Sequence, residues 1–452
     1  MLFRKILMQQ KQKFGTILFI ILFSYFLILM DNSIIFTSTV KIANDLHLNE
    51  AALSWVSNAY TITFGGFLLL AGRLGDLLGR KRIFLTGLLL FGLSSLFIGL
   101  SYSMVEIISW RAIQGIGSAI IAPTSLAILM DNYEGSMRMR AISYYGATAG
   151  IGSSAGLLIG GWLTSAISWR AGFLLNVPFA LFLIILTFIK IKNGKAQRIK
   201  IDYLGAILSV LIATSFVYGI TVTNLWLIAF SIILLLGFIF WEKTQKNPLM
   251  PLELFSNRVR SGSYLARFIF MMAMLPYWFI LPQIMQEIYH FTPLQSGMGF
   301  LPLTIVNFIA ALYLPKLTAR IGNSKVMLVG QGILLLGLIL STVLSPKLGY
   351  FLAIGLPMVL VGLGQGWLLA PLTSAGVQEI PNELSGAASG MTNTMHQIGG
   401  PVGLSLVVFI TSPFQNQSLV YYHWVMGLVT AFIVLGFVVL LITQPHKQVA
   451  EG

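Results

Sequence analysis

The chain has no cysteine and very few charged residues. With no cysteine among 452 residues, disulfides and thiolate metal sites are excluded. Charged residues make up 9% of the sequence and hydrophobic residues 56%, whereas soluble domains carry about 25% charged residues. Acidic residues are fewer than basic ones, with 14 Asp and Glu against 28 Lys and Arg. These shortages exclude a soluble globular fold and predict an integral membrane protein.

Long apolar runs take the place of the missing charge. A helix needs roughly 20 apolar residues to cross a bilayer, and fourteen runs come near that length. They fall at about 14–36, 53–71, 83–102, 107–130, 141–163, 171–190, 203–223, 225–241, 263–287, 295–315, 326–345, 348–371, 387–411 and 422–444. The fold class we predict is therefore all-α integral membrane, with 14 transmembrane helices.

The basic residues orient these spans. An even number of spans puts both termini on one side of the membrane. Lys41, Arg170 and Lys347 fall in loops on the opposite side and Arg111 falls inside a span, while the other Lys and Arg lie in loops on the side of the termini or at span edges flanking them. Cationic loops stay cytoplasmic, so both termini are expected in the cytoplasm. The same placement argues against a nucleic-acid partner for the net charge of +14.

Two parts of the chain echo each other in the same order. Ile120-Ile121-Ala122-Pro123 returns as Leu368-Leu369-Ala370-Pro371, and the small-residue stretch 146–150 returns at 386–390. Duplicated halves around a site near mid-membrane are typical of alternating-access carriers. We expect two pseudo-symmetric six-helix bundles and a central extra helix pair, divided as 1–190, 191–262 and 263–452.

A glycine-rich, charged stretch joins the second and third runs. The sequence Gly-Arg-Leu-Gly-Asp-Leu-Leu-Gly-Arg-Lys-Arg at 72–82 is expected to form a short loop, in which Gly72, Gly75 and Gly79 allow tight turns. Its pattern resembles the signature between the second and third helices of major facilitator superfamily transporters. Without that resemblance, it reads as an ordinary cationic loop that sets topology.

Asp31 is the most informative single residue. It follows an uncharged run, about three quarters of the way across the first span. A carboxylate at that depth costs several kcal/mol unless it is protonated, paired or hydrated, so such residues usually mark proton or cation pathways. Arg111 reaches a similar depth from the fourth span and is a candidate partner for proton coupling. The alternatives are that Asp31 lies at the wet interface and that Arg111 pairs with Glu106.

The fifth run carries glycines at helical spacing. Gly152, Gly156 and Gly160 form one small-residue stripe, which allows close helix packing. The stretch 156–163 resembles the fifth-helix signature of antiporters, with Leu157 in place of the usual proline. Together with stretches 169–178 and 202–205, it resembles the fourteen-helix drug:proton antiporter branch of the superfamily, the multidrug exporters.

The resemblance also implies a cytoplasmic gate. In the family, charges in this loop and at the end of the fourth helix form a latch. The corresponding residues here are Gly72, Asp76, Gly79, Arg80, Asp131 and Arg138. The alternative is a set of independent, solvated charges, since exposed ion pairs contribute little.

Further polar residues lie in the second half. Glu287, at the outer end of the ninth span, is either a second proton-coupling site or an interfacial, ionised residue. Polar residues in the middle of the tenth and thirteenth spans either line a cavity or bond across helices. The predicted substrate cavity comprises Asp31, Tyr60, Gln114, Trp278, Glu287, Asn307, Asn393, His396 and Gln397.

These features predict a transporter rather than an enzyme. The expected function is proton-driven antiport that exports amphipathic, cationic or zwitterionic drugs by alternating access, as in multidrug efflux and antibiotic resistance. A narrower exporter, of a tetracycline–metal chelate or an endogenous metabolite, fits the same motifs. A membrane-embedded enzyme would need clustered carboxylates or histidines and a soluble loop, and a sensor would carry a soluble domain. We expect a monomer in a bacterial cell membrane, with lipid, small-molecule drugs and protons as partners, no cofactor, no metal and no nucleic acid.

Overall fold

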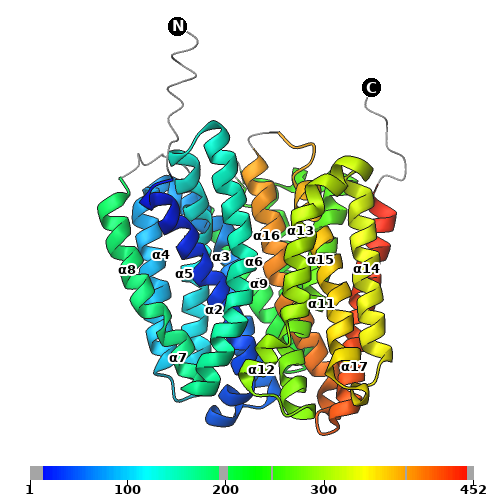
Figure 1. The fold of residues 1–452 in the computed structure, drawn as a ribbon. Helices are drawn as coiled ribbons and strands as arrows, with labels where there is room; N and C mark the ends of the chain where they lie inside the picture. The colour runs from blue at the N-terminus through cyan, green and yellow to red at the C-terminus, as the bar shows by residue number, and fades with distance from the viewer. Residues whose placement is uncertain (1–13, 193–201, 246–247, 382–383, 445–452) are drawn as a thin grey trace, which may run out of the picture.

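The computed structural model describes residues 14–192, 202–245, 248–381 and 384–444, and every regular element in these ranges is a helix. Two short linking helices, α7 and α12, accompany the long ones (Figure 1). The α-helices are α2 (Thr16–Leu46), α3 (Glu50–Leu78), α4 (Arg80–Gly99), α5 (Met104–Asn132), α6 (Gly135–Ala166), α7 (Trp169–Leu174), α8 (Asn176–Lys190), α9 (Tyr203–Thr221), α10 (Leu225–Thr244), α11 (Arg258–Ile288), α12 (Pro293–Met298), α13 (Leu301–Ile321), α14 (Asn323–Val343), α15 (Leu356–Gly376), α16 (Ser385–Thr411) and α17 (Ser418–Thr443).

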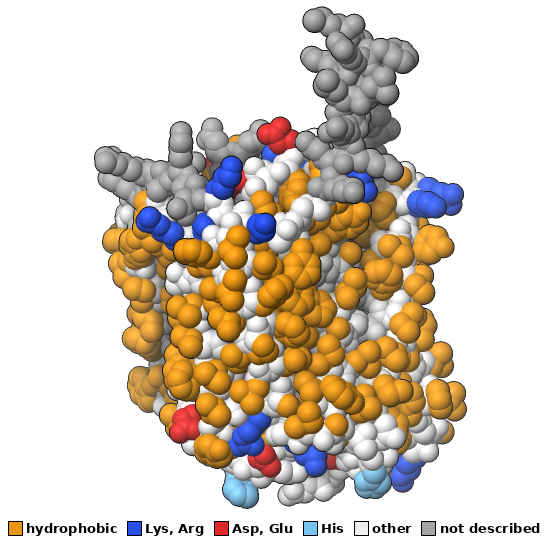
Figure 2. Space-filling view, turned by 60° about the vertical axis from the view of Figure 1, so that its left-hand side comes forward, with side chains coloured by type: hydrophobic (Ala, Val, Ile, Leu, Met, Phe, Trp, Pro, Cys, Tyr) orange, Lys and Arg blue, Asp and Glu red, His pale blue; other side chains and the backbone are white. Residues whose placement is uncertain are grey.

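The prediction of fourteen membrane spans is confirmed. Thirteen helical segments within the described ranges are long and apolar enough to cross a membrane. The fourteenth predicted span, 141–163, lies in the 32-residue helix α6. Figure 2 shows a broad band of hydrophobic side chains between two ends where charged side chains gather, which is the surface that a bilayer requires.

The helices form two groups side by side. Helices α2 to α8 lie in one group and α11 to α17 in the other, and α2 begins at the same end of the molecule at which α17 ends (Figure 1). We call this end the terminal side and the opposite end the far side. Helix α9 contacts α3 of the first group and α16 of the second, and α10 packs on α9.

The first long helix extends well past its predicted end. The sequence places the end of this span near residue 36, but α2 continues to Leu46 and ends where His47 adopts a left-handed conformation, with φ of 51°. Asp31 does not interrupt the helix because its carboxylate is hydrogen-bonded to neighbouring helices. Asp31 therefore lies at the middle of α2. The prediction that it lies three quarters of the way along the first span is wrong.

The prediction of a loop at 72–82 is also wrong. Helix α3 continues to Leu78 and α4 starts at Arg80, so Gly72 and Gly75 are helical. The reversal is made at Gly79 alone, whose φ of 95° is unfavourable for residues with a side chain. The side chain of Asp76 lies outside the described residues.

The two groups touch along α3 and α16 and also at the far side. The side-chain amide of Gln286 in α11 donates to the carbonyl of Thr37 in α2, at 3.4 Å. The backbone N–H of Leu294 in α12 donates to the hydroxyl of Ser165 in α6, at 3.0 Å. Figure 1 shows α12 at this end of the molecule, between α6 and the second group. By contrast, Gly146, in the terminal-side part of α6, faces open space.

Candidate functional site

Asp31 is the centre of a fully buried polar cluster. Its Oδ2 accepts from Arg111 Nη1 at 2.9 Å, and its Oδ1 accepts from Gln114 Nε2 at 3.0 Å and from Asn176 Nδ2 at 2.6 Å. All four side chains are 0% exposed. Because one carboxylate faces one guanidinium, the cluster is electrically balanced with both groups charged.

Arg111 is held on several sides. Its Nε donates to the carbonyl of Val56 at 2.9 Å and its Nη1 to Gln114 Oε1 at 2.6 Å. The guanidinium carbon lies 4.2 Å from the centre of the Tyr60 ring and 5.7 Å from that of Phe173, so aromatic faces cover the cation. Nη2 is buried without a hydrogen-bond partner in the described structure.

The expected contact between Asp31 and Arg111 is therefore present. The alternative partner, Glu106, instead accepts from the backbone N–H of Tyr102 near the start of α5. Helix α5 begins at Met104, which puts Arg111 two turns inside rather than at its opening. All members of the cluster come from the first helix group, so in this conformation it faces into that group.

The predicted glycine stripe of α6 packs directly on α2. A side chain at Gly156 would collide with the carbonyl of Met30, next to Asp31. A Cβ at Gly160 would lie 2.8 Å from Ile34 Cα, and one at Gly152 would lie 3.0 Å from Leu29 Cβ. Leu157 stands where the antiporter signature has a proline, and α6 is continuous through this contact.

The predicted gate residues are brought together only in part. Arg80 Nη1 lies 2.5 Å from Asp131 Oδ1 and also donates to the carbonyl of Ala127. Arg138 donates to two backbone carbonyls at the end of α5, those of Tyr133 and Met130. Gly72 and Gly79 take no part in these bonds, and Gly79 forms the turn between α3 and α4.

The predicted cavity residues fall into three places. Asp31, Tyr60 and Gln114 belong to the buried cluster, where the Tyr60 hydroxyl donates to Ser118 at 2.8 Å. Trp278 and Gln397 reach across to the first group, near Phe36 and Gly65 respectively.

The other members of the predicted cavity lie in the second group. Asn307 packs against Gly366 of α15. Asn393 is exposed and bonds to the carbonyl of Ser389 in its own helix. Glu287 is exposed at the far-side end of α11. His396 accepts a hydrogen bond from the guanidinium of Arg267 at 3.0 Å. Arg267 is not among the predicted site residues.

Sequence reasoning missed two residues of these networks. Asn176 makes the shortest hydrogen bond to Asp31, at 2.6 Å. It lies in the stretch 169–178 that resembles the family, but it is not among the predicted site residues. Arg267 was grouped with charges at the span edges, because its run was expected to begin at 263, whereas α11 begins at Arg258 and buries Arg267 to 8% exposure. An isolated arginine inside a Phe- and Met-rich run was the available signal.

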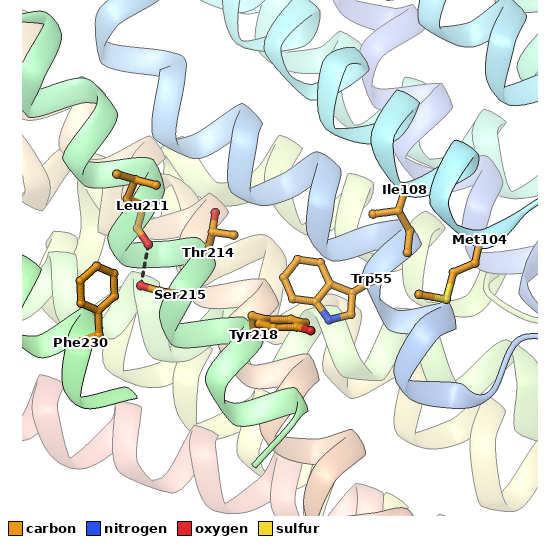
Figure 3. Close-up of a pocket in the computed structure, with 8 residues that line it drawn as sticks. All are labelled: Trp55, Met104, Ile108, Leu211, Thr214, Ser215, Tyr218 and Phe230. Carbon is orange, nitrogen blue, oxygen red and sulfur yellow. Dashed lines mark hydrogen bonds between the residues drawn. The ribbon is translucent and has the colours of Figure 1, made fainter. Parts of the chain in front are cut away.

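An apolar pocket of about 370 Å³ lies elsewhere, between α3, α5 and the extra pair α9–α10 (Figure 3). None of the predicted site residues lines it. Its polar groups include Ser215, whose hydroxyl donates to the carbonyl of Leu211 at 2.6 Å. The lining residues are Trp55, Met104, Ile108, Leu211, Thr214, Ser215, Tyr218 and Phe230.

A bundle of membrane-spanning helices in two groups, with ionisable groups buried among them, is the architecture of many membrane transport proteins. The family model described as Major Facilitator Superfamily matches residues 21–404 and 263–451. The chain belongs to the major facilitator superfamily, and it is therefore a transporter rather than an enzyme.

Similar proteins include named exporters from bacteria. The chain is 33% identical over 390 residues to EfpA of Mycobacterium tuberculosis, an uncharacterized MFS-type transporter, covering 84% of this chain and 73% of that one. It is 32% identical over 410 residues to the cephamycin export protein CmcT of Amycolatopsis lactamdurans, covering 87% and 84%. It is 30% identical over 407 residues to the puromycin resistance protein pur8 of Streptomyces alboniger, covering 86% and 80%.

Solved structures share the fold at low identity. A peptide transporter of the POT type superposes with a TM-score of 0.72 at 17% identity, covering 94% of this chain and 93% of that one. A D-xylose–proton symporter superposes with a TM-score of 0.71 at 13% identity, covering 96% and 98%.

Proposed function

We propose that the protein is a proton-coupled antiporter that exports amphipathic, cationic or zwitterionic drugs by alternating access. The Asp31–Arg111 pair carries this proposal, because it is a titratable carboxylate at mid-helix whose charge is balanced by one guanidinium. The names of the relatives, which include antibiotic export and multidrug transport, support the export of drugs. A narrower exporter remains the second candidate, since CmcT and a tetracenomycin C exporter are named for single compounds.

The proposed cycle uses the charge on Asp31. With the carrier open to the outside, a proton binds the carboxylate, weakens its attraction to Arg111 and favours drug release. After the carrier has turned inward, the proton leaves to the cytoplasm, the pair re-forms and drug binds from the cytoplasm or inner leaflet. Breaking a buried ion pair by removing one partner costs about 3–5 kcal/mol, enough to shift a two-state equilibrium by two to three powers of ten or more.

Helix α6 is the proposed mechanical link between the halves. Its stripe at Gly152, Gly156 and Gly160 lies on α2 on both sides of Asp31, and its Gly161 lies against Pro293 of α12 in the second half. A displacement of α2 would therefore be passed to α12 by backbone contact. The halves that move are assigned as 1–190 and 263–452, with 191–262 between them.

The terminal side is assigned to the cytoplasm. Arg80 and Arg138 lie there, while the far side carries Lys41, Arg170 and Lys347 as its basic residues within the described ranges. The contacts of Arg80 with Asp131 and of Arg138 with the end of α5 are assigned to the cytoplasmic gate, with Asp76 as its fourth charged member. We further propose that the protein works as a monomer in a bacterial cell membrane, with no nucleic-acid partner.

The test is dye efflux in inverted membrane vesicles under an imposed pH gradient. Asp31→Asn should abolish gradient-driven transport while the variant is still inserted into the membrane. Asp45→Asn is the matched control, because Asp45 lies on the same helix but is half exposed and paired with Arg170 at the surface. Wild-type rates in the Asp31→Asn variant would contradict the proposal.

A further inference from the structure

Arg267 is a buried cation that the ion-pair chemistry of the first half does not explain. It lies on α11, well inside the helix, and is 8% exposed. Its Nε donates to His396 Nδ1 at 3.0 Å, and its Nη1 donates to the carbonyl of Leu369 at 3.0 Å and to the hydroxyl of Thr373 at 3.3 Å. A nitrogen that accepts from a guanidinium carries no proton, so His396 is neutral in this arrangement.

All three acceptors of Arg267 are neutral groups. The ion pairs among the described side chains are those of Arg80, Arg111 and Arg170, and Arg267 has no carboxylate within 4 Å in that set. Its hydrogen bonds hold the guanidinium in position but leave its charge unbalanced. An unbalanced cation in a low-dielectric interior costs several kcal/mol.

The cation faces the first half of the molecule. Its partner His396 lies in α16 between Thr394, whose hydroxyl donates to the carbonyl of Gly65 in α3 at 3.5 Å, and Gln397, whose Cβ lies against Gly65. Tyr25 of α2 is within electrostatic range of Arg267. The Tyr25 ring stacks on that of Tyr145 of α6, with centroids 4.0 Å apart and planes at 10°. The surroundings of Arg267 thus come from α2 and α11, α15 and α16, that is, from both halves. Sites in carriers of this design lie between the halves.

We infer that Arg267 binds a carboxylate of the exported compound. A carboxylate would supply the missing negative charge and accept charge-assisted hydrogen bonds from the guanidinium. The inference rests on the proposed export function and narrows it. Among amphipathic drugs, the site selects those with an acidic group, zwitterions included, and disfavours purely cationic ones, which revises the expectation of cationic substrates.

A pair of dyes that differ only in this group tests the inference. Tetramethylrhodamine with its free carboxylate is a zwitterion, and its methyl ester is a cation of nearly the same shape. Binding of each to the purified full chain in neutral detergent is measured by fluorescence anisotropy. The wild type should bind the carboxylate dye about tenfold more tightly, the effect of roughly 1.4 kcal/mol from charge-assisted hydrogen bonds.

Variants of two arginines in α11 show which residue causes the preference for the carboxylate dye. Arg267→Gln should remove the preference, chiefly by weakening the binding of the carboxylate dye, whereas Arg267→Lys should keep most of it. Arg258→Gln is the matched control, since Arg258 is exposed at the start of α11. Size-exclusion profiles show that each variant is folded.

The outcomes separate this inference from the proposed function. Equal affinity of the wild type for the two dyes, no binding of the carboxylate dye, or an unchanged preference in Arg267→Gln would each overturn it. Tight binding of phosphatidylglycerol but of neither dye would assign the site to a lipid phosphate and also overturn it. Arg267-dependent binding without gradient-driven transport in vesicles would support the inference and contradict proton-coupled export.

Discussion

Two buried arginines, one in each half, are set in opposite electrical surroundings. Arg111 is fully buried against Asp31, and its other contacts come from the same half. Arg267 is almost as buried, but its hydrogen bonds go to an imidazole, a hydroxyl and a carbonyl. The first charge is balanced inside the protein, whereas the second has no balancing carboxylate in the described structure.

This difference suggests a division of tasks. A balanced pair responds to a proton, because protonation of Asp31 removes one of its two charges. A positioned cation without a counterion responds to an anion brought from outside the protein. On this view the first half senses the proton and the second half recognises the cargo, and helix α6, which touches both α2 and α12, connects the two events.

The largest expected effect comes from removing each arginine in turn. Arg111→Leu leaves the Asp31 carboxylate buried and unpaired, so it should lower the free energy of unfolding by about 3–5 kcal/mol. Arg267→Leu removes an unbalanced charge along with its hydrogen bonds, so the loss should be about 1 kcal/mol or less. Thermal unfolding of the detergent-solubilised proteins measures both. Adding Asp31→Leu to Arg111→Leu should recover most of the lost stability, and equal losses for the two single variants would refute the comparison.

The next effect concerns the glycines that face the two charged sites. Gly156 meets the carbonyl of Met30, beside Asp31, and Gly399 of α16 meets the carbonyl of Phe268, beside Arg267. An added methyl at either position pushes two helices apart, at a cost of about 1–3 kcal/mol. Gly156→Ala should slow gradient-driven efflux, and Gly399→Ala should reduce the preference for the carboxylate dye.

Gly150→Ala supplies the control for both, because a side chain there meets open space. It should leave transport and dye preference at wild-type values. If Gly156→Ala reduced only dye preference and Gly399→Ala only efflux, the division of tasks between the halves would have to be reversed.

The first half was the easier part to predict from sequence. Asp31 follows a long uncharged run, so its position inside the membrane was readable, and the opposite directions of the first and fourth spans brought Arg111 to it. The depth of Asp31 was misjudged because the predicted span ended near residue 36, where polar residues become frequent, whereas α2 continues to Leu46.

The second half was harder for a related reason. The start of α11 is rich in Arg and Ser, so the hydropathy of the sequence placed Arg267 near the membrane surface. Burial of that residue depends on α15 and α16, more than a hundred positions later in the chain. Asn176 presents the same problem, since its contact with Asp31 spans 145 positions. Span number follows from composition, but the partners of polar groups follow from packing.

A smaller effect is expected at the terminal-side ion pair, which contrasts with both buried arginines. The side chains of Arg80 and Asp131 are 27% and 53% exposed, so their contact should contribute only about 0.2–1 kcal/mol to stability. Asp131→Asn should therefore leave thermal unfolding nearly unchanged. If the pair belongs to the gate, the same variant should still change the transport rate, by up to a few-fold. An unchanged rate at low and high salt would mean that the two charges are independent and solvated.

The smallest effect is expected at Glu287, the other carboxylate considered for proton coupling. Unlike Asp31, its side chain is exposed at the far-side end of α11, and it lies close enough to Glu50, itself hydrogen-bonded to the Tyr421 hydroxyl, for electrostatic interaction. An exposed carboxylate exchanges protons with bulk water and cannot store one between the two orientations of the carrier. Glu287→Gln should therefore keep the wild-type number of protons moved per dye, measured as paired pH and dye fluxes in proteoliposomes, with at most a twofold change in rate. A lower proton count in this variant would show that the second half also senses protons and would end the contrast between the two arginines.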